Sequence, residues 1–269
     1  MSKIWFITGA SRGFGRLWAE AALRRGDRVV ATARDVTALD PLVRRYGDNV
    51  LALPLDITDR KAAFEAVERA VERFGRLDVV VNNAGYGLFG MVEELTEADL
   101  RAQMETNFFG TVWVTQAVLP VLRAQRSGRI LQITSEGGVR AYPAIGAYHA
   151  SKWAVEGLSE SLAQEVTAFG VHVTMVEPGP YATDFAGATS LRTAERHPDY
   201  AAVHEVTDAK EWVLGDPAAT ADAILLLADT EKPPRRLVLG NTLPEIEAIY
   251  AERLREWREW APVTEAAFG

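Results

Sequence analysis

Cysteine is absent from the 269 residues of this chain. Disulfides, thiolate metal sites and cysteine nucleophiles are therefore excluded. Histidine is scarce as well, because only four are present and none has HxxH or HExxH spacing. We therefore expect no zinc site.

Long apolar runs are also lacking. No run approaches the roughly 18 residues of a membrane span, and IWFITGA near the N-terminus lacks the long apolar core of a secretory signal. Basic stretches are missing too, since the formal net charge is −8 and the pI is about 5.2. These features predict a soluble, cytoplasmic protein without a membrane span or a nucleic-acid partner.

Short β-branched and aliphatic runs alternate with longer segments of helical periodicity. This alternation is typical of an α/β protein with a parallel sheet that is covered by helices on both faces. Seven such runs occupy the chain through residue 240 without a linker, so residues 1–269 are interpreted as one domain. The expected strands are 3–8, 28–33, 49–55, 77–82, 128–134, 171–177 and 236–240.

Two segments depart from this rhythm. Residues 180–206 have weak periodicity and many small or polar residues, which predicts a substrate lid over 180–215. Residues 243–260 predict a charged amphipathic helix, and we expect it to pack against the domain edge rather than to bind a partner. Its apolar stripe consists of Ile246, Ile249, Tyr250, Leu254 and Trp257.

A glycine-rich turn, TGASRGFGR, follows the first expected strand and leads into a helical pattern. Gly9, Gly13 and Gly15 allow positive φ angles and a close approach of the backbone. A pyrophosphate group can then lie at the helix N-terminus. The order strand, glycines, helix predicts nucleotide binding.

The end of the second strand indicates which dinucleotide is bound. Folds that prefer NAD usually have an acid there for the ribose hydroxyls, but here the position is Ala33 and Arg34 follows. Arg12 lies within the glycine turn. Two guanidinium groups suit a 2′-phosphate, so NADP(H) is favoured and NAD(H) is the alternative.

Two further motifs follow strands. Asp56 comes after the third strand and can accept a hydrogen bond from an adenine amino group. Asn83, Ala84 and Gly85 come after the fourth, where a flexible backbone meets the middle of the cofactor. Ligands of open α/β sheets bind at such carboxyl ends.

The stretch YHASK puts Tyr148 and Lys152 four residues apart in a helical pattern, so both side chains share a helix face. Ser135 ends the fifth strand, thirteen residues before Tyr148. A free tyrosine has a pKa of about 10. A nearby ammonium group, or the positive ring of an oxidised nicotinamide, lowers that pKa and makes proton transfer easier.

Together these motifs resemble the short-chain dehydrogenase/reductase family, in the branch with a TGxxxGxG turn and a YxxxK motif. They occur in family order from residue 8 to residue 183, with an asparagine in TNFFG and the stretch PGPYAT completing the set. The glycine turn, the TARD stretch and the C-terminal helix are similar to hydroxysteroid- and retinol-dehydrogenase-like bacterial members. The resemblance implies a Rossmann-type fold and hydride transfer between a nicotinamide and a carbonyl or alcohol.

The resemblance also assigns residues to roles. Tyr148 would be the general acid/base, Ser135 would bind the substrate oxygen, Lys152 would bind the nicotinamide ribose, and Asn107 would hold a water of the proton relay. Pro178, Gly179 and Thr183 would contact the nicotinamide. The implied cofactor-binding set is Gly9, Ser11, Arg12, Gly13, Phe14, Gly15, Arg34, Asp56, Ile57, Asn83, Ala84, Gly85, Tyr148, Lys152, Pro178, Gly179 and Thr183.

Glu136, directly after the expected catalytic serine, is either a solvated loop acid or a group of the substrate site. His149 is expected at a solvated helix position. Aromatic and apolar residues favour an apolar substrate. The expected substrate wall comprises Glu136, Tyr142, Tyr181 and Phe185, with Leu88, Phe89 and Trp212 as further candidates.

The leading functional hypothesis is an NADPH-dependent carbonyl reductase or the reverse alcohol dehydrogenase. A 3-oxoacyl-carrier-protein reductase is the main alternative among enzymes, and its docking surface should be basic, as at residues 123–129. A non-catalytic NADP-sensing regulatory protein is the alternative from another class. For assembly we expect a monomer or a dimer through residues 98–124 and 148–168, with a tetramer as a further alternative.

Overall fold

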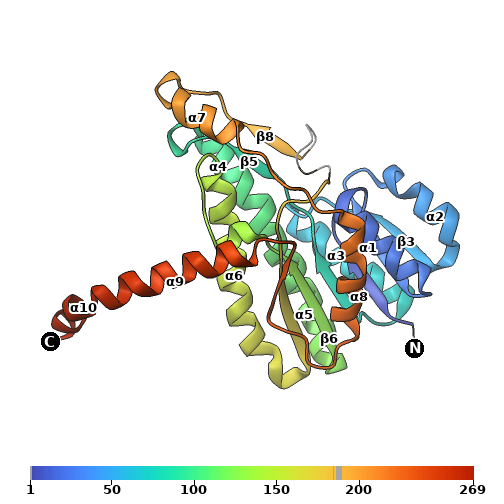
Figure 1. The fold of residues 1–269 in the computed structure, drawn as a ribbon. Coiled ribbons are helices and arrows are strands. Elements are labelled where there is room, and N and C mark those ends of the chain that lie inside the picture. The colour runs from blue at the N-terminus through green and yellow to red at the C-terminus, as the bar shows by residue number, and fades with distance from the viewer. Residues whose placement is uncertain (1, 184, 186–189) are drawn as a thin grey trace.

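The computed structural model describes residues 2–183, 185 and 190–269. Its centre is a seven-stranded parallel sheet of order β3-β2-β1-β4-β6-β7-β9 (Figure 1). Each strand expected from the sequence is confirmed to within two residues at either end. The strands are β1 (Ile4–Ile7), β2 (Arg28–Ala33), β3 (Val50–Pro54), β4 (Val79–Asn82), β6 (Gly128–Ile133), β7 (Val171–Pro178) and β9 (Arg236–Leu239).

Helices cover both faces of the sheet, as the alternating pattern predicts. The helices α1 (Gly13–Arg24), α2 (Asp40–Tyr46) and α8 (Ala221–Asp229) share one core with one face, and α3 (Arg60–Phe74), α5 (Gly110–Gln125) and α6 (Gly146–Val166) share the other. Strand β1 shows why, since Ile4 and Phe6 enter one core while Trp5 and Ile7 enter the other. Alternate side chains of a strand point to opposite faces, so a doubly covered strand is apolar throughout.

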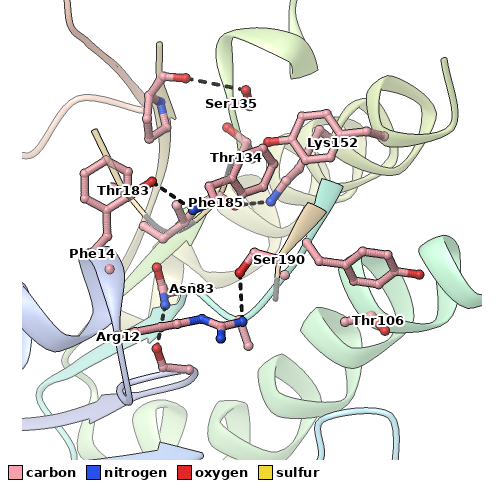
Figure 2. A pocket seen from close by; sticks show the side chains of 18 of the residues that line it. Arg12, Phe14, Asn83, Thr106, Thr134, Ser135, Lys152, Thr183, Phe185 and Ser190 are labelled. Carbon is pink, nitrogen blue, oxygen red and sulfur yellow. Dashed lines mark hydrogen bonds between the residues drawn. The ribbon is translucent and has the colours of Figure 1, made fainter. Parts of the chain in front are cut away.

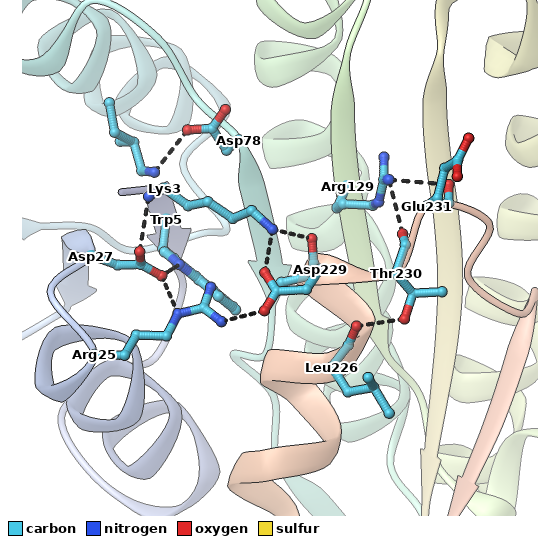
Figure 3. Close-up of polar contacts among 12 residues, drawn as sticks. Lys3, Trp5, Arg25, Asp27, Asp78, Arg129, Leu226, Asp229, Thr230 and Glu231 are labelled. Carbon is cyan, nitrogen blue, oxygen red and sulfur yellow. Dashed lines mark hydrogen bonds and ion pairs between the residues drawn. The ribbon is translucent and has the colours of Figure 1, made fainter. Parts of the chain in front are cut away.

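Ion pairs and hydrogen bonds close the amino-terminal edge of the sheet (Figure 3). Asp27 accepts hydrogen bonds from Trp5 Nε1 at 2.8 Å and from Arg25 Nε at 2.6 Å. Lys3 pairs with Asp229 at the end of α8. This edge is therefore tied together by polar contacts, and the opposite edge carries the cavity described below.

A second, smaller layer consists of β5 (Gly87–Phe89) paired in parallel with β8 (Leu191–Thr193), with α4 (Glu97–Met104) and α7 (Ala201–Asp208) nearby (Figure 1). β8 and α7 belong to the segment 180–215 that the sequence predicts as a lid, so this segment holds regular structure where little periodicity was expected. Residues 184 and 186–189 of that segment lie outside the described residues.

The C-terminal helix has its predicted bounds to within one residue, but its packing differs from the prediction. It spans α9 (Leu243–Glu259) and is followed by α10 (Ala261–Phe268), and both lead away from the body beyond α6 (Figure 1). Ile246 is buried, but Leu254 is 44% and Trp257 is 64% exposed. Only the start of the stripe packs, so the expectation that the helix lies along the domain edge is wrong.

Among the described residues, no helix is both long enough and apolar enough to cross a bilayer.

Candidate active site

The carboxyl ends of the parallel strands open onto a cavity of about 600 Å³. Its wall is built from the loops after β1, β2, β3, β4, β6 and β7, together with α6 and the 180–215 segment (Figure 2). Strand order reverses beside β1, where β1 lies between β2 and β4. This is the point at which open α/β sheets bind their ligands.

The glycine turn closes one end of the cavity. Gly9 and Gly13 have φ angles of 66° and 52°, which L side chains rarely adopt. A Cβ atom on Gly15 would lie 2.4 Å from the carbonyl oxygen of Gly9 and 2.6 Å from Nδ2 of Asn83. The turn therefore needs glycine at three positions, and its backbone is free to approach a phosphate group closely.

Asn83 attaches this turn to the end of β4. Its Nδ2 donates to the carbonyl oxygens of Thr8 at 2.9 Å and Gly9 at 3.2 Å, and its backbone N–H donates to the hydroxyl of Thr8 at 2.9 Å. The N–H of Ala84 donates to the same hydroxyl at 3.0 Å. The NNAG and TGASRGFG motifs, far apart in sequence, thus form one rigid unit.

Arg34 and Asp56, after β2 and β3, line the part of the cavity where we expect the adenosine of a dinucleotide. Arg34 is exposed, and Asp56 accepts hydrogen bonds from the backbone N–H and the hydroxyl of Thr58 at 3.0 and 2.8 Å. Arg12 is oriented differently from Arg34, because its guanidinium donates to the Ser190 hydroxyl at 2.8 Å (Figure 2). Arg12 therefore joins the glycine turn to the 180–215 segment.

Nearly all of the expected cofactor residues line the cavity. Gly15 is the exception, since it packs beneath the turn against Gly9. Those in the wall are Gly9, Ser11, Arg12, Gly13, Phe14, Arg34, Asp56, Ile57, Asn83, Ala84, Gly85, Tyr148, Lys152, Pro178, Gly179 and Thr183.

Ser135 and Tyr148 meet on one wall. Ser135 follows β6, and its Oγ accepts a hydrogen bond from the N–H of Gly137 at 3.0 Å and donates to the Pro178 carbonyl at 3.4 Å. The Tyr148 hydroxyl hydrogen-bonds to Ser135. Burial raises the pKa of Tyr148 to about 12, opposed by the Ser135 hydrogen bond and reinforced by the charge of Glu136. The sequence-based expectation of a lowered pKa is therefore wrong for the protein alone, and the phenol holds its proton.

Lys152 lies one turn further along α6 and is 6% exposed. Its Nζ donates to the Ile133 carbonyl at 2.7 Å (Figure 2) and lies 5.7 Å from the centre of the Tyr148 ring. Burial lowers the pKa of Lys152 to about 8, and the charge of Glu156 opposes this effect. The pKa of Lys152 is thus close to physiological pH.

Asn107 lies one layer behind this wall, in a π-helical turn (Glu105–Phe109) between α4 and α5. Its Oδ1 accepts from the N–H of Tyr86 at 3.1 Å, and its Nδ2 donates to the Tyr86 carbonyl and the Ser151 hydroxyl, both at 3.0 Å. π-Turns in helices often mark functional sites. Asn107 connects the loop after β4 to α6.

The far end of the cavity is aromatic. The Phe185 ring lies 5.5 Å from that of Tyr148, and the Trp212 ring lies 5.5 Å from that of Tyr142. Leu88 on β5 differs from the sequence expectation, because it is 1% exposed and does not line the cavity. The expected residues in the wall are Glu136, Tyr142, Tyr181, Phe185, Phe89 and Trp212.

The structure decides between the two interpretations of Glu136 and corrects the interpretation of His149. Glu136 is 3% exposed, and its Oε2 accepts a hydrogen bond from Arg140 at 2.5 Å, so it is a buried wall group rather than a solvated loop acid. His149 is 4% exposed, with Nδ1 2.9 Å from the Gly137 carbonyl and Nε2 accepting from the N–H of Tyr142 at 3.2 Å. The neutral ring fastens the 136–142 loop to α6, and burial lowers its pKa.

Other wall residues carry no motif in the sequence. Tyr86 and Thr134 had a local signal, because Tyr86 directly follows the NNAG motif and Thr134 directly precedes Ser135. The others come from segments whose position in space depends on the fold. This group comprises Tyr86, Thr134, Ile145, Ser190, Arg192 and Leu214.

Metal binding has no support in the described part of the chain, where no group of three or more His, Asp or Glu side chains could hold an ion. The glycine cradle, the two polar turns and the strand order instead fit a dinucleotide. These features define a Rossmann-type nucleotide-binding protein with a serine, a tyrosine and a lysine at the end of its groove.

The chain belongs to the short-chain dehydrogenase family, and the family model described as short chain dehydrogenase matches residues 3–194. It is an oxidoreductase of that family. Among curated relatives, "Oxidoreductase BOA17" of Botryotinia fuckeliana is 42% identical over 268 residues, covering 96% of this chain and 98% of the relative. The 3-ketodihydrosphingosine reductase of Bacteroides thetaiotaomicron is 36% identical, covering 97% and 93%.

Solved structures agree with this assignment. A short-chain dehydrogenase from Streptomyces avermitilis has a TM-score of 0.92 at 42% identity, with 99% of this chain and 98% of that chain covered. An alcohol dehydrogenase from Thermococcus sibiricus, complexed with 5-hydroxy-NADP, has a TM-score of 0.75 at 30% identity, covering 89% and 96%. A family member from Burkholderia phymatum in complex with NAD has a TM-score of 0.79 at 25% identity, covering 98% and 95%. These neighbours support a nicotinamide cofactor.

Proposed function

We propose that the protein is an NADPH-dependent reductase of apolar ketones or aldehydes, which also catalyses the reverse alcohol oxidation. The convergence of Ser135, Tyr148 and Lys152 at one end of a dinucleotide-shaped cavity carries this proposal. NADPH, when bound, supplies the hydride. The residues of the chain bind and orient the reactants and move the proton.

Tyr148 is the proposed general acid. Its raised pKa keeps the phenol protonated at neutral pH, so its hydroxyl can donate a proton to the carbonyl oxygen. Ser135, hydrogen-bonded to the same hydroxyl, would hold that oxygen in place. The positive charge of Lys152 would stabilise the tyrosinate left after proton transfer.

Asn107 is proposed to keep the groups of the proton relay correctly placed relative to one another. It links the loop after β4 to α6 through Tyr86 and Ser151, so it fixes the helix that carries Tyr148 and Lys152. Pro178, Gly179 and Thr183 follow β7 and would hold the nicotinamide end of the cofactor.

A preference for NADPH is proposed from the adenosine end. Ala33 ends β2 without the acid that would repel a phosphate, and the exposed guanidinium of Arg34 lies beside it at the cavity. Arg12 would contribute from the turn if it exchanged its contact with Ser190 for the phosphate.

The substrate end supports an apolar carbonyl compound. Tyr142, Tyr181, Phe185 and Trp212 supply an aromatic wall, and the buried Glu136 beside Ser135 is proposed to contact the substrate as well. Two proteins similar to this chain are named as a 3-ketodihydrosphingosine reductase and an alcohol dehydrogenase, which is consistent with carbonyl and alcohol chemistry.

A 3-oxoacyl-carrier-protein reductase is less well supported. The basic stretch 123–129 lies where β6 begins, at the sheet edge opposite the cavity. Two of its arginines are engaged there, because Arg126 donates to the Ala168 carbonyl and Arg129 donates to those of Thr230 and Glu231 (Figure 3). A carrier bound at that edge would lie at the opposite ends of the strands from the cavity.

The deciding experiment mixes purified protein with NADPH or NADH and a panel of carbonyl compounds, namely a steroid ketone, an aromatic ketone, a long-chain ketone and a 3-oxoacyl thioester. Loss of the reduced-nicotinamide signal with an apolar ketone, faster with NADPH, is expected. Tight NADPH binding without reduction of any carbonyl would favour the non-catalytic sensor instead.

A further inference from the structure

A buried group of charges lies behind Lys152 and has no role in the function proposed above. Glu156 follows Lys152 by one turn of α6, and Glu177 and Arg236 face it from β7 and β9. Glu156 is 4% exposed and Glu177 is 2% exposed. Acids this deeply buried are rare unless their charges are paired.

Arg236 holds these carboxylates together. Its NH2 lies 2.9 Å from Oε2 of Glu156, its Nε lies 3.1 Å from Oε1 of Glu177, and its NH1 lies 2.6 Å from Oε1 of Glu160. One guanidinium, whose side chain is 36% exposed, thus faces three carboxylates, and among these only Glu160 is well exposed to water. Its two buried carboxylates, Glu156 and Glu177, share this one guanidinium, so negative charge is in excess when all groups are ionised.

The carboxyl group of Glu177 binds its proton more tightly than an ordinary glutamate does. Burial, together with the neighbouring charge of Glu156, raises the pKa of Glu177 to about 7. Burial raises the pKa of Glu156 as well, but hydrogen bonds from Thr134 and Arg236 favour its charged form. Glu156 is therefore the carboxylate best placed to act on its surroundings as an anion.

Glu156 and Lys152 contact neighbouring residues at the end of β6. Lys152 Nζ donates to the carbonyl of Ile133, and the side chain of Thr134 hydrogen-bonds to Glu156. The backbone at Gly138 closes over this pair, since a Cβ there would lie 3.0 Å from Cγ of Glu156. Solvent cannot easily screen the two charges from one another.

The charged and titratable groups around Lys152 come from four elements. Tyr148, Glu156 and Glu160 lie on α6, and Glu136 lies on the loop after β6. Glu177 and Arg236 lie on β7 and β9, and the π-turn contributes the neutral Asn107. Glu156 is the acid whose charge favours the protonated form of Lys152 against the effect of burial.

We propose that Glu156 is a positioning residue of the active site, and that its carboxylate, held by Arg236, keeps the Lys152 ammonium charged and in place beneath Tyr148. The inference rests on the role proposed above for Lys152. It extends the active site to residues on α6, β7 and β9 that lie behind Lys152.

The test is a titration of Lys152 by NMR in protein carrying ¹³C at the lysine ε-carbon. The chain has five lysines, and the Lys152→Met variant identifies the signal of Lys152. Glu156→Gln is expected to lower the titration midpoint on the order of one pH unit, about a tenfold loss of proton affinity. The high-pH limb of the turnover profile should move to lower pH with it.

Glu160→Gln is the matched control. Glu160 lies one turn further along α6 and pairs with the same arginine, but its side chain is 52% exposed. This variant should leave both the Lys152 midpoint and the turnover profile unchanged. Glu156→Asp keeps a carboxylate one methylene further away, so its midpoint should fall between those of the wild type and Glu156→Gln, and it serves if the glutamine variant does not fold.

A Lys152 midpoint equal to the wild-type value in both Glu156 variants would overturn the proposal. An equal shift in the Asp and Gln variants would overturn it too, because the charge would then not be the cause. The titration needs no substrate and no turnover. Failure of carbonyl reduction in the panel assay would therefore count against the proposed function, but not against the effect of Glu156 on Lys152.

Discussion

The ammonium group of Lys152 lies 5.7 Å from the centre of the Tyr148 ring and donates a hydrogen bond to the last residue of β6. This contact fixes Lys152 between the helix and the sheet, while the tyrosine hydroxyl faces Ser135. The buried lysine and the protonated tyrosine are thus oriented by different neighbours. Their chemistry can be tested one group at a time.

Removal of the Tyr148 hydroxyl should separate binding from turnover. Tyr148→Phe takes away the proposed proton donor but keeps the ring, so carbonyl reduction should fall by roughly 10²- to 10⁴-fold. NADPH affinity, measured by fluorescence titration, should change little. Tyr250→Phe on the protruding α9 is the control and should be as active as the wild type. Undiminished turnover in Tyr148→Phe would contradict the mechanism.

The choice between NADPH and NADH should depend on Arg34. Arg34→Ala removes a charge-assisted hydrogen bond to the 2′-phosphate, worth about 1.5–3 kcal/mol, so NADPH affinity should fall about tenfold or more. NADH affinity should stay nearly constant, because that cofactor has no such phosphate. Dissociation constants for both cofactors provide the measurement, with Arg69→Ala on the exposed side of α3 as control. Equal weakening of the two cofactors would refute the assignment.

Two glycine-to-alanine changes should have opposite effects. A Cβ at Gly15 would lie 2.4 Å from the Gly9 carbonyl oxygen, which cannot move without breaking the turn, so Gly15→Ala should abolish cofactor binding and lower the melting temperature. At Gly157, within α6, an added Cβ would meet no atom of the described residues within 4 Å. Gly157→Ala should therefore stabilise the protein by about 0.5–1 kcal/mol through helix propensity. Thermal unfolding gives the melting temperatures of both variants and of the wild type. A melting temperature of Gly15→Ala equal to that of the wild type would show that the turn tolerates the added Cβ.

Stability should depend on pH through Glu177. Its pKa in the folded protein is about 7, above its ordinary value, so the favourable contribution of its protonated form is complete at low pH and is lost as the pH rises through 7. Glu177→Gln keeps a neutral side chain at every pH. Relative to the wild type, its free energy of unfolding should therefore increase between pH 5 and pH 8, on the order of 2 kcal/mol.

Chemical denaturation at the two pH values measures this difference. Glu165→Gln, at an exposed position near the end of α6, should show no such dependence on pH. A difference between Glu177→Gln and the wild type that is the same at pH 5 and pH 8 would mean that Glu177 is ionised throughout.

The sequence predicted the seven strands and most of the cavity wall. β-branched runs between helical segments mark strands that are buried on both faces, and this signal is local. The glycine turn, the NNAG motif and the Tyr148–Lys152 spacing are equally local, because each depends on backbone geometry or on one helical turn. The order of the strands then brings these motifs to a single edge of the sheet.

The tertiary structure alone decided which polar side chains are buried. The sequence leaves open whether Glu136 is solvated and suggests that His149 is, but both are buried by the contact between the 136–142 loop and α6. The C-terminal helix shows the reverse case, since its apolar stripe points mostly to solvent. A sequence pattern tells which face of a helix is apolar, but burial depends on whether a distant segment covers that face. For the same reason the charges behind Lys152 became visible only when α6, β7 and β9 were seen together.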